Sequence, residues 1–168
     1  GSNLLHEVKL ERGDVEAAFR DSDIVVESVY TTPFIDHAFL QPEAGVARLD
    51  SHGRVAIWVG TQWPHEDRRQ ISHALGLPEE DIRVIQMTTG GAFGGREDIS
   101  VQIILALMAL RTGRTVKMVY TRPESLIRGT KRHPFRVRYR SGATRDGKLT
   151  AIDVDLLSNA GAYGSTSV

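Results

Sequence analysis

The residues best suited to chemistry are four glycines in the run Gly90–Gly95, which is followed at once by Arg96, Glu97 and Asp98. Glycine takes positive φ angles readily, and it has no side chain to hold a ligand away from the main-chain amides. The apolar residues 99–110 predict a helix directly after the glycines, and unpaired N–H groups at the start of a helix favour a negative group. The segment therefore predicts a site for a phosphate, an oxo group or a carboxylate.

Glycines between a strand and a helix can also do no more than form a tight turn. Two familiar phosphate-binding motifs do not match the spacing. No Lys-Ser or Lys-Thr follows the last glycine, which excludes a P-loop. The order Gly-Gly-Ala-Phe-Gly-Gly also differs from the G-x-G-x-x-G of dinucleotide-binding folds.

Three further clusters accompany the glycine loop along the chain. They are His37-Ala-Phe-Leu-Gln-Pro-Glu43, Thr61-Gln-Trp-Pro-His65 and Lys131-Arg-His-Pro-Phe135. In this order, and with Ser158-Asn-Ala-Gly161 after them, the clusters resemble the molybdenum-cofactor-binding large subunit of the xanthine dehydrogenase and aldehyde oxidase family. The resemblance runs from about Leu5 to the end of the chain.

The resemblance implies a molybdopterin cofactor, with the cytosine dinucleotide as one form of it. It implies an enzyme that hydroxylates an N-heterocycle such as a purine, or an aldehyde, and passes electrons to iron–sulfur and FAD groups on partner chains or domains. The family's catalytic glutamate in a Gly-Glu context and its second loop, Arg-Gly-Phe-Gly, have no counterpart here. We therefore expect a fragment that is inactive alone and that pairs with the remainder of the large subunit.

The resemblance also assigns cofactor-binding residues. Gln62 corresponds to the glutamine whose side-chain amide approaches an oxo ligand of the molybdenum, and a neutral NH₂ donor suits that contact. Phe93 and Gly94 correspond to loop residues that pack against the metal centre, and Gly91 and Gly95 complete the expected set. From the residues alone, Gln62 could equally cap a helix beginning near Pro64, and Phe93 could fill the core.

Glu97 matches the position at which xanthine-hydroxylating members place a glutamate facing the purine. The expected role is to orient the substrate, because a carboxylate can exchange hydrogen bonds with ring nitrogens. The alternative is that Glu97 only complements the dipole of the expected helix, a stabilisation of about 0.3–1 kcal/mol.

Composition narrows the function classes. The chain has 21 basic and 21 acidic residues, so no overall field favours nucleic acid. It has no cysteine, which excludes thiolate ligation and fits a reducing, cytosolic compartment. No apolar run is long enough to span a membrane. The six histidines show no zinc-ligand spacing, so we expect no metal held by protein ligands.

Arg136, Arg138 and Arg140 alternate along a predicted strand, which favours a solvated strand face over a nucleic-acid site.

The order of the predicted strands and helices that position these residues indicates an α+β fold with a mixed sheet. Strands at 43–49 and 54–59 flank Asp50-Ser-His-Gly53, a good hairpin turn. A helix from Pro64 to Gly76 then leads to a strand at 82–87, the expected β-α-β crossover. The apolar residues 99–110 surround their helix and predict that it is buried.

We expect one molybdopterin-binding domain over residues 4–168, with residues 1–3 as a tag remnant. Two other classes of function are compatible with the residues. One is a stand-alone module that binds an anion or nucleotide through the glycine loop, and the other is a scaffold domain without a ligand.

Overall fold

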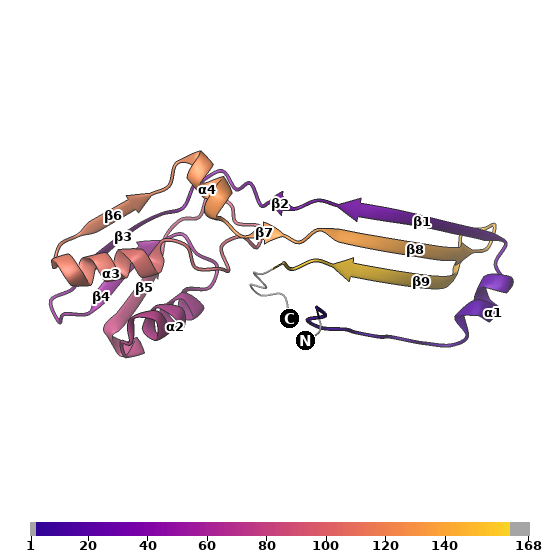
Figure 1. Cartoon of the computed structure of the whole chain (residues 1–168), viewed down its shortest axis with the longest axis horizontal. Helices are drawn as coiled ribbons and strands as arrows, with labels where there is room; N and C mark the ends of the chain where they lie inside the picture. The colour runs from indigo at the N-terminus through magenta and orange to yellow at the C-terminus, as the bar shows by residue number, and fades with distance from the viewer. Residues whose placement is uncertain (1–2, 162–168) are drawn as a thin grey trace. The chain divides into compact units, whose positions relative to one another are not determined.

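The computed structural model describes residues 3–161 of the chain (Figure 1). Its contacts divide the chain into two compact units, residues 36–132 and residues 1–35 with 133–168. The single cofactor-binding domain expected over 4–168 stays a prediction. Helices and antiparallel hairpins accompany one mixed sheet, which confirms the α+β class. The last part of the stretch that carries the family resemblance, residues 162–168, lies outside the described residues.

The unit formed by residues 36–132 is built on a four-stranded sheet of order β5-β4-β3-β6. Its strands are β3 (Ala44–Leu49), β4 (Val55–Val59), β5 (Ile82–Gln86) and β6 (Val116–Val119). The predicted hairpin joins β3 to β4, and the Asp50 carboxylate closes it by accepting the amides of His52 at 2.8 Å and Arg54 at 3.0 Å. β4 and β5 run parallel and are connected through a helix, so the predicted β-α-β crossover is confirmed.

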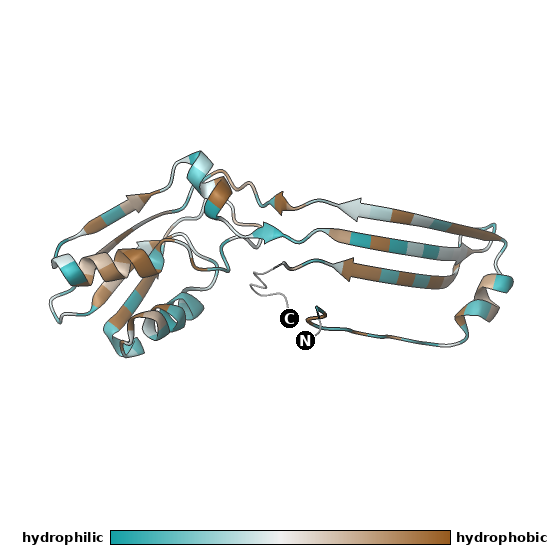
Figure 2. Ribbon diagram, viewed as in Figure 1, coloured by the Kyte–Doolittle hydropathy of each residue, from teal (hydrophilic) through white to brown (hydrophobic). Residues whose placement is uncertain are grey.

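The crossover helix is α2 (Pro64–Leu75), followed by a 3₁₀ turn, η1 (Glu79–Asp81). Proline suits the first turn of α2 because the N–H it lacks has no partner there. Gly76 ends the helix in the left-handed region, with φ of 66°. Figure 2 shows α2 as mostly hydrophilic, consistent with a helix that buries only one stripe. That stripe centres on Ile71, which is completely buried.

The helix after the glycine loop is α3 (Gln102–Thr112). It packs on β3 and β4, and Leu105, Ala106 and Ala109 enter the core. Two details of the expectation were wrong. The helix begins at Gln102, not at residue 99, and its outer face leaves Ile104, Leu107 and Met108 more than a third exposed.

Three further elements are short. Helix α4 (Arg122–Arg128) begins with a capping box, in which Thr121 and Glu124 exchange hydrogen bonds between side chain and backbone. β7 (Lys131–Arg132) forms a two-stranded sheet with β2 (Ile35–Asp36).

The other unit contains α1 (Val15–Arg20) and an antiparallel sheet of order β1-β8-β9. Its strands are β1 (Ile24–Thr32), β8 (Phe135–Ala143) and β9 (Leu149–Ser158). The alternating arginines of β8 share one face, where Arg138 pairs with Glu27 at 3.3 Å and with Asp153 at 2.9 Å. Arg140 of the same face pairs with Glu16 and lies over the Phe19 ring. The predicted strand is confirmed, whereas only Arg136 of its three arginines is exposed.

Within the described residues, no helix has the length and apolar character needed to cross a bilayer.

Candidate functional site

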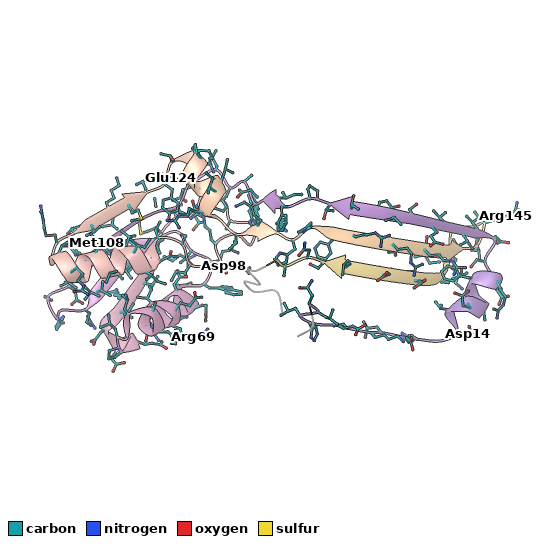
Figure 3. The ribbon with its side chains drawn as sticks, in the orientation of Figure 1. Asp14, Arg69, Asp98, Met108, Glu124 and Arg145 are labelled. Carbon is teal, nitrogen blue, oxygen red and sulfur yellow. The ribbon has the colours of Figure 1, made fainter. Side chains whose placement is uncertain are left out.

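Sheet topology brings the sequence clusters of residues 36–132 to one edge. β4 and β5 are parallel neighbours, so their carboxyl ends lie side by side, and the Met87 amide donates to the Val59 carbonyl at 2.9 Å. β4 leads directly to Thr61 and Gln62, whereas β5 leads to the glycine loop. The segment 37–43 enters β3, the antiparallel neighbour of β4, from the same edge. Asp98, labelled in Figure 3, belongs to the stretch between the loop and α3.

Arg96 organises the centre of this edge, and its side chain was not anticipated as a site residue. It is 4% exposed, and its guanidinium donates to the carbonyls of Gly91 at 3.2 Å and Gly60 at 3.3 Å. A third donation reaches the Gln41 carbonyl. Burial lowers the pKa of Arg96, and the charge of Glu43 opposes that effect. The guanidinium nevertheless keeps its charge, because arginine is not deprotonated in proteins.

Aromatic and amide side chains from the 37–43 segment support the same loop. The Phe39 ring lies 4.2 Å from the Arg96 guanidinium carbon, a cation–π distance. The Gln41 side-chain oxygen accepts the Gly90 amide at 2.8 Å. Arg122 in turn donates to the Phe39 carbonyl at 2.9 Å and to the Leu40 carbonyl. The segment 37–43 therefore has a supporting role at the edge of the sheet.

The glycines are required for two different reasons. Gly91 and Gly94 have φ of 91°, a conformation that side chains disfavour. Gly95 has no room for one, because a Cβ atom there would lie 2.8 Å from the His37 ring. Phe93 takes a φ of 53° although it is not glycine, and it is 64% exposed. The alternative that Phe93 fills the core is therefore wrong.

The loop also presents amides without partners. Among the described residues, no acceptor meets the backbone N–H groups of Gly91, Ala92, Phe93 and Gly94. Free backbone donors are uncommon unless water or a ligand meets them. A helix was expected to begin directly after the glycines and to add its own N–H groups, but α3 begins at Gln102, so the donors belong to the loop itself.

Gln62 reaches this loop directly. Its backbone N–H donates to the Arg96 carbonyl at 3.0 Å, and its side-chain oxygen accepts the Arg96 amide at 3.2 Å. Because only the oxygen of the side-chain amide can accept that N–H, the NH₂ group is the end left available. It has no partner among the described residues. The capping alternative is wrong, since α2 begins after Trp63 with no side-chain cap.

Glu97 lies next to Arg96 in the stretch before α3 and is half-buried. Its carboxylate forms no hydrogen bond or ion pair with the described residues. It does not lie in the first turn of a helix, so the dipole alternative is wrong. Between residues 3 and 161 no three His, Asp or Glu side chains are grouped as a metal site would require.

A second network beneath the site was also missed from the sequence. Asp67 of α2 is completely buried and accepts from the Gln102 side-chain amide at 3.1 Å. The Gln102 oxygen accepts the Ser100 amide at 2.7 Å, so the pair ties α2 to the stretch that follows Glu97. Burial raises the pKa of Asp67, and the hydrogen bond from Gln102 partly offsets the effect.

Several backbone N–H groups and one neutral NH₂ group without described partners therefore lie on residues that are joined by hydrogen bonds to the buried Arg96. Such donors fit a ligand that is rich in acceptor atoms and carries negative charge.

Comparison with known proteins agrees with this chemistry. The whole chain, residues 1–168, matches the family model described as "Molybdopterin cofactor-binding domain". It is 46% identical over 166 residues to the "Nicotinate dehydrogenase large molybdopterin subunit" of Eubacterium barkeri, covering 98% of this chain and 39% of the relative. It is 39% identical to a subunit of a probable xanthine dehydrogenase of Bacillus subtilis (strain 168), covering 97% of this chain and 22% of that protein.

Among solved structures, the aldehyde oxidoreductase from Desulfovibrio gigas superposes with a TM-score of 0.81 at 24% identity. The match covers 90% of this chain and 17% of that one, and it supports the fold alone. The chain thus spans 39% of the nicotinate dehydrogenase subunit and smaller shares of the other two proteins.

Proposed function

Because this chain belongs to the molybdopterin cofactor-binding domain family, we propose that it supplies the glycine-loop side of a molybdopterin site in a molybdenum hydroxylase large subunit. Gln62, Gly91, Phe93, Gly94 and Gly95 are the proposed cofactor-binding residues. The cofactor is molybdopterin or its cytosine dinucleotide. When bound, it would supply the two-electron oxidation of the substrate, with water as the source of oxygen.

One observation carries the proposal: the Gln62 side chain shares a hydrogen bond with Arg96 at 3.2 Å, and the adjoining loop has unpartnered amides. Gly94 leaves space in front of its backbone, since a Cβ atom there would meet only the His37 ring at 3.8 Å. A main chain this open can approach an acceptor closely. The donors are neutral, so they would hold the cofactor without exchanging protons with it.

Glu97 is the proposed substrate-orienting residue. Its half-buried carboxylate has no partner among the described residues. In the sequence, Glu97 comes two residues after the last glycine of the loop. A carboxylate in this position could hydrogen-bond to a ring nitrogen and favour an N-heterocycle over a simple aldehyde. The names of the two relatives, a nicotinate dehydrogenase and a probable xanthine dehydrogenase, support an N-heterocyclic substrate.

The remaining functions of the enzyme would belong to other parts of the large subunit and to partner proteins. We propose that the rest of a large subunit supplies the catalytic base and the second side of the cofactor site. Iron–sulfur and FAD partners would receive the electrons. In this arrangement the 168-residue chain alone has no hydroxylase activity.

The test is cofactor retention. The chain would be produced with the rest of its enzyme in cells that make molybdopterin, and molybdenum and oxidised pterin would be measured per mole of protein. Gln62→Leu removes the available NH₂ group and should reduce retention about tenfold, because one hydrogen bond to a charged group is worth about 1.5–3 kcal/mol. Gln70→Leu is the matched control, since the Gln70 amide donates to Glu66 within α2.

If the Gln62→Leu protein retained its full molybdenum and pterin content, Gln62 would not be a cofactor-binding residue. A wild-type protein without pterin would overturn the proposed function and leave an anion-binding module or a scaffold.

A further inference from the structure

Three consecutive carbonyls of the glycine loop are each held by a donor. Arg96 donates to the Gly91 carbonyl at 3.2 Å, and the Gly95 amide donates to the Ala92 carbonyl at 2.8 Å. Arg132 donates to the Phe93 carbonyl at 2.8 Å. The outer two of these three bonds come from arginine side chains.

The carbonyls determine where the amides point. In a trans peptide the C=O and N–H bonds point in opposite directions, and the described backbone has no cis peptide bond. Fixing the Gly91 carbonyl therefore directs the Ala92 N–H away from Arg96. In the same way, fixing the Phe93 carbonyl directs the Gly94 N–H away from Arg132. These are two of the amides that have no partner among the described residues.

The loop needs this restraint because of its glycines. Gly91 and Gly94 both have φ of 91°, and a peptide plane next to a glycine can rotate at little conformational cost. A rotated plane would present an oxygen to the ligand in place of an N–H. That oxygen would repel a negatively charged or oxygen-rich group.

Arg132 is well placed to act as such a restraint. Its neighbour Lys131 pairs with Asp36 at 3.1 Å, which anchors β7. Burial, followed by the nearby charge of Arg132, lowers the pKa of His37, and the His37 ring lies against Gly95. The guanidinium thus lies beside the loop. Its charge also adds attraction for an anion.

We infer that Arg96 and Arg132 are positioning residues that aim the Ala92 and Gly94 amides at the ligand of the glycine loop. This role rests on the proposed function for the chemistry of that ligand. Neither arginine need touch the ligand, because each acts through a carbonyl. The planar fork of arginine matters at Arg96, where three carbonyls are bound by one side chain.

Arg132 is the better residue to test, because it is exposed and its removal leaves no buried charge. Sodium tungstate would be titrated into the ¹⁵N-labelled 168-residue chain while the amide resonances are followed by NMR. In the wild-type chain, we expect the largest shifts at residues 92–94. Arg132→Ala should weaken tungstate binding about tenfold and abolish the selective response of Gly94, with an unchanged melting temperature.

Two further variants separate charge from geometry. Arg132→Lys keeps the charge and can still donate to the Phe93 carbonyl, so it should restore part of the Gly94 response. Arg128→Ala removes an exposed arginine of α4 and should bind tungstate as the wild type does.

A Gly94 response that survives in Arg132→Ala with wild-type affinity would overturn the inference, as would a wild-type chain with no shifts at 92–94. Either result can occur with full molybdopterin content in the complete enzyme, and the proposed function would then stand without the arginine role. Absence of pterin from that enzyme would instead refute the proposed function.

Discussion

Replacing Gly95 by alanine tests how tightly the loop is packed. It adds no backbone strain, because Gly95 does not have a positive φ. A Cβ atom at this position would lie 2.8 Å from both Cγ and Nδ1 of His37 and 3.0 Å from Cε1 of Phe39. Ordinary carbon contacts lie at about 3.5–4.0 Å, so the new methyl group overlaps both rings. Phe39 is buried against Arg96 and cannot move freely.

The expected cost follows from that overlap. Forcing an extra methyl group into a packed region typically destabilises a protein by about 1–3 kcal/mol. For a unit the size of residues 36–132, each kcal/mol lowers the melting temperature by about 4–8 °C. Gly95 is not among the positive-φ glycines, so this loss would be steric.

Urea unfolding followed by tryptophan fluorescence would measure the change, since Trp58 and Trp63 lie in the same unit as the loop. Gly53→Ala is the matched control, because Gly53 has φ of 78° and open space around it. It should show only conformational strain, about 1–2 kcal/mol. Adding His37→Ala to Gly95→Ala should recover part of the lost stability. An unchanged or increased stability of Gly95→Ala, or no recovery with His37→Ala, would refute the steric reasoning.

Two other predictions concern carboxylates near the loop. Burial raises the folded-state pKa of Asp67, so its contribution to stability is fully present below the ordinary pKa of about 3.9 and is lost as pH rises through the raised value. Asp67→Asn cannot ionise, so its stability relative to wild type should increase as pH rises through that window. Urea unfolding at a series of pH values would measure this. A difference in unfolding free energy between the two proteins that does not change with pH would contradict the prediction. Glu97→Gln should lower kcat/KM of the complete enzyme for an N-heterocycle about 10²-fold with unchanged molybdenum content, whereas Glu80→Gln on η1 should have no effect. If the two variants had equal kcat/KM values, Glu97 would have no role in orienting the substrate.

Local patterns were sufficient for much of the fold. The turn residues Asp50–Gly53 predicted the β3–β4 hairpin because they set the chain reversal by themselves. Pro64 and Gly76 likewise marked the two ends of α2, since each residue acts through its own backbone. The alternation of Arg136, Arg138 and Arg140 predicted a strand, which is β8, because side chains two positions apart share one face.

The start of α3 could not be read in the same way. The apolar residues begin at Ile99, and their pattern does not show that Gln102 binds Ser100 and the buried Asp67. Those contacts hold the stretch before α3 out of the helix. The pattern also suggested a helix that is apolar all round, but only one of its faces has a partner within the described chain.

The sequence alone determined which residues could take part in chemistry and in what order they occur. Glycines free to adopt positive φ, an amide at position 62 and a carboxylate at position 97 are properties of the residues themselves. Only the tertiary structure decided that Gln62 meets Arg96, 34 positions away, and that the Arg96 guanidinium is buried among loop carbonyls. The physical reason is that β4 and β5 pair in parallel, which places the segments leaving both strands at one edge of the sheet.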